Sequence, residues 1–174
     1  MKTSGFSMTG TQLEGDPLDS ELRKAMERAG RWLALRPRTV SEMRDRLLQG
    51  GFEEGTVERA LTRLTELRLI DDESFARQWV EERARRKGLG PRALVAELEA
   101  KGVDPEVAGA AVAGAADTEE RRAVEWAQRQ LRRGVDLPLS KLAQRIRQGL
   151  LRRGFDVQVA DAATRAVMPP EGWD

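Results

Sequence analysis

The sequence contains no cysteine, no histidine and no tyrosine among its 174 residues. Their absence excludes disulfide bonds, Cys/His zinc sites, thiol nucleophiles and imidazole general bases. A metal site built from carboxylates alone, or a Ser/Lys pair, stays open in principle, but no spacing of these residues indicates either one. The sequence therefore predicts a protein that is not an enzyme, with no catalytic residues, no cofactor and no metal ion.

Long apolar runs are missing as well. No stretch approaches the roughly 18 apolar residues that a membrane span needs, and the first residues lack the apolar core of a signal peptide. We therefore expect a cytoplasmic protein. The net charge is only +1 at pH 7, so any contact with nucleic acid has to come from local charge.

The residues that are abundant favour helices. Leu, Ala, Arg and Glu dominate the chain, while aromatic residues make up only 5% of it. A hydrophobic share of 40% beside a charged share of 34% suits thin helical layers with large solvated faces. We predict an all-α protein.

Tryptophan marks an internal repeat. Trp32, Trp79 and Trp126 lie 47 residues apart, and an alanine precedes each of them by three positions. A second marker follows each tryptophan, a glycine with an apolar residue and an acid after it: Gly51-Phe52-Glu53, Gly102-Val103-Asp104 and Gly154-Phe155-Asp156. Chance matches are the alternative, but two markers that recur three times in one order favour a helical repeat array. Each tryptophan has apolar neighbours, so we predict that it belongs to the core of its repeat.

Capping patterns predict where the helices begin. Asp71 fits an N-cap. Thr39 with Glu42, and Asp117 with Glu120, fit capping boxes.

The ends of the helices are marked by glycines, because Gly102 and Gly154 fit the left-handed residue that follows a helix. The predicted helices cover residues 19–35, 40–49, 54–67, 72–86, 91–101, 105–115, 118–133, 139–153 and 157–167. The chain then divides into a disordered leader (1–17), three three-helix repeats (18–68, 69–116 and 117–167) and a tail (168–174). A three-helix unit of this size has a thin core, so we expect the repeats to stack in tandem.

Two short runs have a functional and a structural interpretation. Asp71-Asp72-Glu73 has the composition of a metal site, but three adjacent carboxylates at a helix start do not converge on one point, and capping accounts for them. Gly88-Leu89-Gly90 could cradle a phosphate, yet it lacks the preceding strand and the Lys-Ser/Thr that such loops have. We predict a helix start and a turn.

Positive charge is concentrated locally. Basic residues close the helix that carries Trp79 and continue on the next one: Arg83, Arg85, Arg86, Lys87, Arg92 and Lys101. Between positions 121 and 165 the chain holds eleven basic residues and four acids. Such asymmetry steers a protein toward DNA or an acidic protein surface. The alternatives are a favourable interaction with the helix dipole and an arginine-rich solvated face.

The middle repeat carries the most distinctive run, residues 69–77, Leu-Ile-Asp-Asp-Glu-Ser-Phe-Ala-Arg. Further matching positions follow it in order: Arg83, Lys87-Gly88, Arg92, Glu97-Leu98 and Lys101-Gly102-Val103. These residues resemble the RecX family of bacterial recombinase regulators. Residues 36–43 of the first repeat also fit, with Met43 where the family usually has leucine. Residues 151–155 match more loosely, and the resemblance covers roughly residues 22–167.

The resemblance implies tandem three-helix units in an elongated, curved array. It also implies a protein that binds the RecA recombinase filament and inhibits its recombinase, ATPase and co-protease activities, thereby modulating DNA repair and the SOS response. RecA is then the partner, single- or double-stranded DNA is a further candidate, and we expect a monomer that occupies the filament groove reversibly. The candidate contacts are Asp72, Arg77, Arg83, Arg85, Arg86, Lys87, Arg92, Lys101, Arg132, Arg133, Arg145, Arg152 and Arg153.

Two other classes of function stay open. The second and third helices of a repeat, joined at a glycine turn, could form a helix-turn-helix-like unit of a DNA-binding protein or transcription regulator. Glu53, Glu54 and Glu58 would then meet phosphates in the first repeat, which disfavours this interpretation. The other alternative is an assembly scaffold without a role in nucleic-acid binding.

Overall fold

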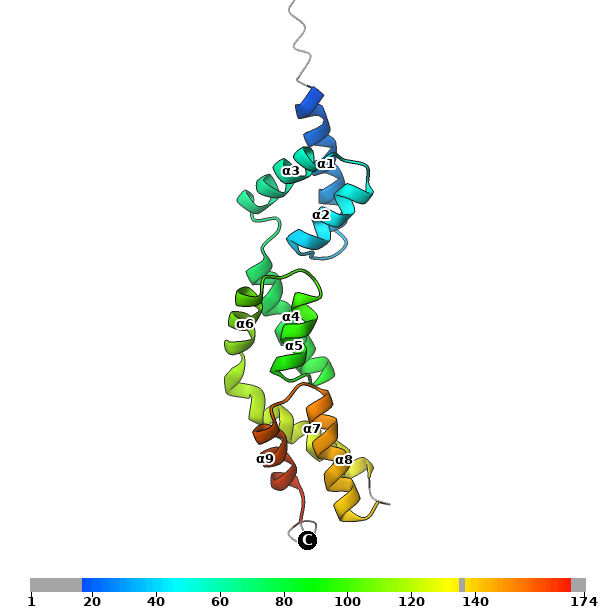
Figure 1. The fold of residues 1–174 in the computed structure, drawn as a ribbon, viewed down its shortest axis with the longest axis vertical. Helices are drawn as coiled ribbons and strands as arrows, with labels where there is room; N and C mark the ends of the chain where they lie inside the picture. The colour runs from blue at the N-terminus through cyan, green and yellow to red at the C-terminus, as the bar shows by residue number, and fades with distance from the viewer. Residues whose placement is uncertain (1–16, 135–136, 170–174) are drawn as a thin grey trace, which may run out of the picture.

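The computed structural model describes residues 17–134 and 137–169, and this part of the chain contains helices and no strand. The α-helices are α1 (Pro17–Leu33), α2 (Val40–Gln49), α3 (Glu54–Glu66), α4 (Asp72–Lys87), α5 (Pro91–Glu99), α6 (Pro105–Ala113), α7 (Glu119–Arg133), α8 (Leu139–Arg152) and α9 (Val157–Val167). They form three successive bundles of three helices along one long axis (Figure 1). The predicted all-α array of three-helix repeats is confirmed.

Each predicted helix is present, and its ends lie within two residues of the predicted ones. Pro17, predicted as the last residue of the leader, begins α1 instead, at the N-terminal position where proline is tolerated. Residues 1–16 and 170–174, the rest of the predicted leader and most of the predicted tail, lie outside the described residues.

Most predicted caps are present. The Asp71 carboxylate accepts a hydrogen bond from the backbone N–H of Ser74 at 2.9 Å, and the Thr39 hydroxyl accepts one from the N–H of Glu42 at 3.1 Å. The box predicted at Asp117 involves a side chain that lies outside the described ones. A 3₁₀ turn, η1 (Ala116–Thr118), precedes α7, so Thr118 is the N-cap, and its hydroxyl donates to the Ala115 carbonyl instead of capping the helix.

The glycines predicted to follow helices have the left-handed backbone that the turn requires. The φ angle is 75° at Gly102 and 84° at Gly154, a region that costs side-chain-bearing residues free energy. The apolar residue after each glycine, Val103 or Phe155, is buried. The chain therefore reverses sharply and returns the next helix to the core.

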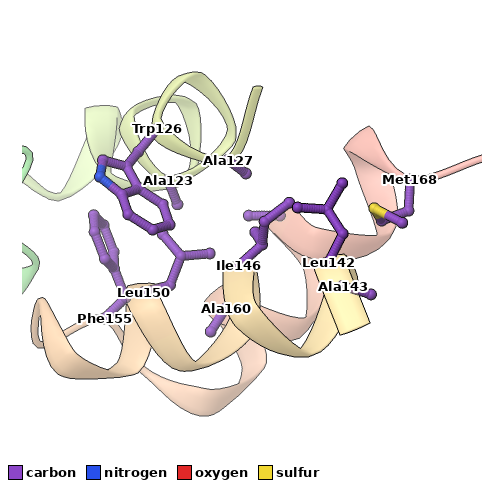
Figure 2. Close-up of a cluster of buried hydrophobic side chains, with 11 residues drawn as sticks. Ala123, Trp126, Ala127, Leu142, Ala143, Ile146, Leu150, Phe155, Ala160 and Met168 are labelled. Carbon is purple, nitrogen blue, oxygen red and sulfur yellow. The ribbon is translucent and has the colours of Figure 1, made fainter. Parts of the chain in front are cut away.

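Each bundle has its own apolar core. Met43, Leu47 and Leu64 are fully buried among α1, α2 and α3. The second core has Leu94 and Leu98 at its centre. In the third, the Trp126 ring lies against Leu150 and Phe155 (Figure 2). Three separate cores in a row are typical of a repeat array, in which each unit contacts only its neighbours.

The tryptophans differ in burial. Trp126 is 7% exposed and belongs to the core as predicted. Trp32 and Trp79 are only partly buried and pack at the edges of their cores. A guanidinium lies over each of these two rings, Arg46 at 5.3 Å from Trp32 and Arg83 at 4.0 Å from Trp79. The core prediction therefore holds fully for Trp126 alone, because the rings of Trp32 and Trp79 are only partly buried and each lies beneath a guanidinium.

Candidate functional site

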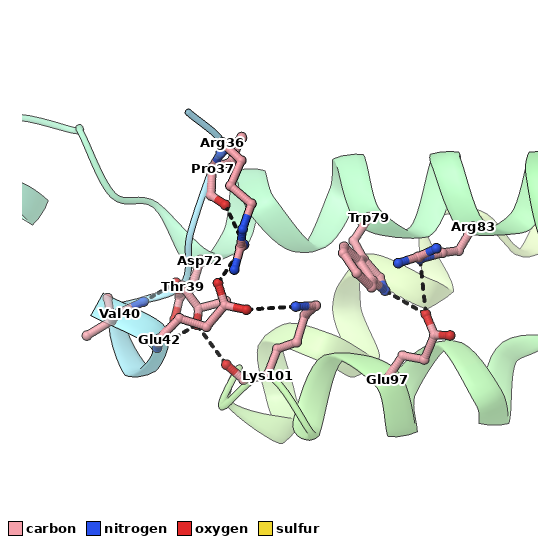
Figure 3. Close-up of polar contacts among 10 residues, drawn as sticks. All are labelled: Arg36, Pro37, Thr39, Val40, Glu42, Asp72, Trp79, Arg83, Glu97 and Lys101. Atoms are coloured by element: carbon pink, nitrogen blue, oxygen red, sulfur yellow. Dashed lines mark hydrogen bonds and ion pairs between the residues drawn. The ribbon is translucent and has the colours of Figure 1, made fainter. Parts of the chain in front are cut away.

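The junction between the first two repeats is polar (Figure 3). Thr39, at the start of α2, donates to the backbone carbonyl of Lys101 at 2.7 Å. In the opposite direction, the Asp72 carboxylate accepts from the N–H of Val40 at 2.9 Å. Burial raises the pKa of Asp72, and the hydrogen bond from Val40 offsets this only in part. Asp72 therefore caps a helix of the neighbouring repeat.

Lys101 completes this junction. Its ammonium lies 2.7 Å from a carboxylate oxygen of Glu42 and 4.5 Å from the centre of the Trp79 ring. The other carboxylate oxygen of Glu42 accepts from Arg36 at 2.9 Å. Partial burial alone would raise the pKa of Glu42, but these two cations outweigh it and hold the pKa below its ordinary value.

Other candidate contact residues are engaged within the chain. Arg83 and Lys87 both face Glu97, at 3.3 and 3.4 Å, and Glu97 also accepts from the Trp79 indole at 3.0 Å. Arg92 reaches Asp156 of the third repeat at 2.7 Å. Arg83 and Lys87 thus pair within the second repeat, and Arg92 links the second repeat to the third, so a partner would have to compete for all three.

Arg77 and Arg86 form exposed pairs along α4, with Glu73 at 3.7 Å and Glu82 at 3.3 Å. Such pairs contribute little stability, so both guanidiniums stay accessible to a partner.

The remaining candidates are exposed and form no ion pair with any described residue: Arg85, Arg132, Arg133, Arg145 and Arg152. Arg153 belongs with them, although it is half-buried. Its guanidinium lies 4.4 Å from the centre of the Trp126 ring, and its buried Nε has no hydrogen-bond partner. Burial, together with the nearby charges of Arg152 and Arg129, lowers the pKa of Arg153. Arg129, Arg152 and Arg153 thus form a cluster of like charges, here called the guanidinium cluster.

The second and third repeats meet through backbone. The N–H of Gly90 donates to the Arg153 carbonyl at 2.7 Å, and the N–H of Arg92 donates to the Gly154 carbonyl at 3.1 Å. A Cβ at Gly90 or at Gly154 would overlap the backbone of the other repeat. Gly88, at the end of α4, lies beside Trp126 and Arg129. The predicted Gly88–Gly90 turn therefore places the guanidinium cluster next to the basic end of α4.

A groove of about 900 Å³ runs between α4, α6 and α7. Its floor is apolar and made of small side chains: Val80, Ala84, Val107, Ala111 and Ala115. Charged residues line its rim, among them Arg77 and Arg85 of the predicted contacts. No motif in the sequence marks the groove. The signal was the run of alanine and glycine in α6, because such small side chains leave space beside α4, the helix that α6 contacts.

Arg122 is the most enclosed charge of the groove. Its Nε donates to the Thr118 carbonyl at 3.3 Å, while one terminal nitrogen is buried without a hydrogen-bond partner. Burial lowers the pKa of Arg122, and the nearby Glu119 offsets this only in part. No ion pair joins the two side chains within the described structure.

In residues 17–134 and 137–169, no three acidic side chains are placed to hold a metal ion together. Asp71 and Asp72 each cap a helix instead. None of the described helices is both long and apolar enough to cross a membrane.

Comparisons with known proteins agree on one family. Residues 25–64 match the family profile described as the first three-helix domain of RecX, and residues 71–112 match that of its second three-helix domain. The regulatory protein RecX of Mycobacterium sp. (strain JLS) is 38% identical over 168 residues, which cover 90% of each chain. That of Mycobacterium ulcerans (strain Agy99) is 40% identical over 132 residues, 75% of this chain and 76% of the relative.

Solved structures show the same fold. The crystal structure of RecX from Lactobacillus salivarius superimposes with a TM-score of 0.80 at 23% identity, over 86% of this chain and 97% of the other. A second crystal structure of regulatory protein RecX gives a TM-score of 0.78 at 24% identity, over 94% of this chain and 82% of that one. The order of the helices, the matched domains and the curated relatives lead to one conclusion: the chain belongs to the RecX family of regulatory proteins.

Proposed function

We propose that the protein binds the filament that the RecA recombinase of its host forms on DNA, and inhibits its recombinase, ATPase and co-protease activities. In this way it would modulate DNA repair and the SOS response in the cytoplasm. The protein makes and breaks no covalent bond in this mechanism. It acts as a monomer by occupying filament surface reversibly, with the second and third repeats as its contact units.

The observation that carries this proposal is the set of exposed guanidiniums without acidic partners on α4, α7 and α8. Arg85, Arg132 and Arg145 have no ion pair with a described residue, so nothing within the described chain has to be broken before they bind a carboxylate or a phosphate. Guanidinium forms two parallel hydrogen bonds with either group. An elongated array with such groups along its second and third repeats is suited to a filament surface that exposes both protein and nucleic acid.

The first repeat favours a filament over a DNA operator as the target. At the start of α3, Glu53, Glu54 and Glu58 are exposed, and Arg44 of α2 pairs with the last two. A helix-turn-helix-like unit built from α2 and α3 would bring these carboxylates against phosphates, which repel them. A protein surface that carries both signs of charge has no such difficulty.

Charge reversal on α8 tests the proposal. Arg145 and Arg152 lie seven residues apart and so share one face of the helix. We expect Arg145→Glu together with Arg152→Glu to weaken inhibition of DNA-dependent ATP hydrolysis by the host recombinase about tenfold or more, since each lost charge-assisted contact costs about 1.5–3 kcal/mol. Helicity should not change.

The matched control is Arg23→Glu together with Arg31→Glu on α1, which has the same charge change and nearly the same spacing. The control should inhibit like the wild type. If both double variants lose inhibition equally, net charge and not the α8 surface is responsible. If the wild type leaves the ATPase untouched at equimolar concentration, the recombinase is not the target.

A further inference from the structure

The groove between α4, α6 and α7 has two ends of opposite charge. α4 starts beside the first repeat, where Asp72 caps α2, and ends beside the third, where Gly88 lies next to Arg129. Near the first repeat the rim carries two acids, Glu73 and Glu106. Near the third repeat it carries four arginines: Arg85, Arg121, Arg122 and Arg129. Glu81 and Glu125 are further acids of the rim. Glu73 pairs with Arg77, and Glu125 pairs weakly with Arg121. The excess of charge is therefore negative at one end and positive at the other.

The groove also has the dimensions of a helix-binding site. From Glu73 to Gly88, α4 extends about 22 Å at 1.5 Å per residue, which matches a partner helix of about four turns. Ala84, Ala110, Ala111 and Ala115 let another helix axis approach closely, because they add little volume between the backbones. The walls are helices whose backbone groups are bonded internally, so no strand edge is offered to an extended peptide.

We propose that this groove binds an amphipathic α-helix of the recombinase, with small apolar residues on the floor of the groove and a carboxylate over Arg122. The inference rests on the proposed function and deepens it by assigning the partner's contact element. The acidic end of the partner helix lies at Arg85, Arg122 and Arg129, and its basic end lies at Glu73 and Glu106. The buried terminal nitrogen of Arg122 without a hydrogen-bond partner supplies a donor for that carboxylate.

Other occupants fit less well. The DNA backbone would meet Glu73, Glu81 and Glu106 along the groove and would leave the apolar floor without a contact. A second copy of this chain would have to present a helix with the complementary order of charges. Both occupants are outcomes of the experiment below.

Filling the groove tests the inference. Ala110 is exposed on α6 and lines the groove, whereas Ala96 is exposed on α5 and does not. We expect Ala110→Trp to lower the affinity of the full-length protein for the recombinase filament on single-stranded DNA at least about tenfold, by occupying the space of an anchor residue. The matched variant Ala96→Trp should bind within about twofold of wild type. Circular dichroism should show the same helicity and melting temperature for all three proteins.

A photo-crosslinking amino acid placed at position 110 identifies the occupant. We expect a cross-link to a helical recombinase segment that carries an acidic cluster at one end. Arg85→Glu combined with Arg129→Glu should reduce its yield several-fold. Equal affinity of Ala110→Trp and wild type, or a cross-link to DNA or to a second copy of this chain, would overturn the inference while leaving the proposed function intact. If the wild type does not bind the filament at all, the proposed function fails and this inference with it.

Discussion

Glu42 shows how one residue can be assigned locally and still be misjudged. The pattern around Thr39 predicts that the Glu42 side chain completes a capping box. The Glu42 carboxylate binds Arg36 and Lys101 instead. Lys101 lies 59 positions further along the chain, so no local pattern reveals the pairing. The same holds for Asp72, predicted as part of a helix start, and for Arg92, predicted as a partner contact, because both side chains link one repeat to the next.

The lowered pKa of Glu42 gives its contribution a definite pH dependence. A carboxyl group with a lower pKa in the folded than in the unfolded protein stabilises the fold fully above its unfolded value, and this stabilisation is lost as the pH falls through the folded value. We expect Glu42→Gln to reduce the free energy of unfolding by about 1–2 kcal/mol at pH 7. The difference from wild type should shrink steadily below pH 4.5, the ordinary value.

Urea unfolding followed by circular dichroism over a pH series measures this dependence. Glu99→Gln is the control, because Glu99 is exposed on α5 and forms no ion pair with a described residue. It should change stability by less than about 0.5 kcal/mol at every pH. If Glu42→Gln loses the same amount of stability at pH 3 and at pH 7, packing and not charge is responsible for the loss.

At the scale of the helices, the sequence was informative because the signals are local. Apolar spacing, caps and glycines act within a few residues, and so they locate every helix end within two positions. The start of α7 has a feature that the local pattern does not reveal: a 3₁₀ turn precedes the helix, and the Thr118 hydroxyl donates backward to the Ala115 carbonyl.

Gly102 joins this local role to a contact between repeats. Its φ angle of 75° strains any residue with a side chain, and a Cβ there would overlap Ser41 of the first repeat. We expect Gly102→Ala to lower the free energy of unfolding by about 1–3 kcal/mol. Urea denaturation measures the change. The control is Gly109→Ala, inside α6 with open space around it, which should stabilise the protein by up to about 1 kcal/mol. If Gly109→Ala lowers the free energy of unfolding as much as Gly102→Ala does, the backbone strain and the overlap with Ser41 are not the cause.

At the scale of the whole molecule, the candidate site lies where the sequence says least. The groove combines α4, α6 and α7, and its shape depends on how two repeats with separate cores are placed against each other. In the sequence, Arg121, Arg122 and Arg129 are only part of a basic region. Whether an arginine is free, as Arg132 is, or engaged, as Arg83 is, depends on contacts that only the assembled array creates.

The placement of the second and third repeats depends on the approach of their backbones at Gly90. A Cβ at this position would meet the backbone N of Phe155 at 2.5 Å. The Gly90→Ala substitution therefore has to push the two backbone segments apart and weaken the hydrogen bonds that Gly90 and Arg92 donate across the junction. Because repeats contact only their neighbours, the loss of stability should stay near this junction.

Amide hydrogen exchange of the Gly90→Ala variant measures this effect. We expect exchange to accelerate about tenfold or more at residues 90 and 92 and at the turn between α8 and α9, while amides of α1, α2 and α3 keep their rates. Gly30→Ala, in open space on α1, should leave the junction unchanged. Acceleration spread evenly over all three repeats would mean that the array unfolds as one unit. If the junction alone responds and inhibition of the recombinase weakens with it, the placement of the second and third repeats, and with it the groove between them, is a determinant of binding.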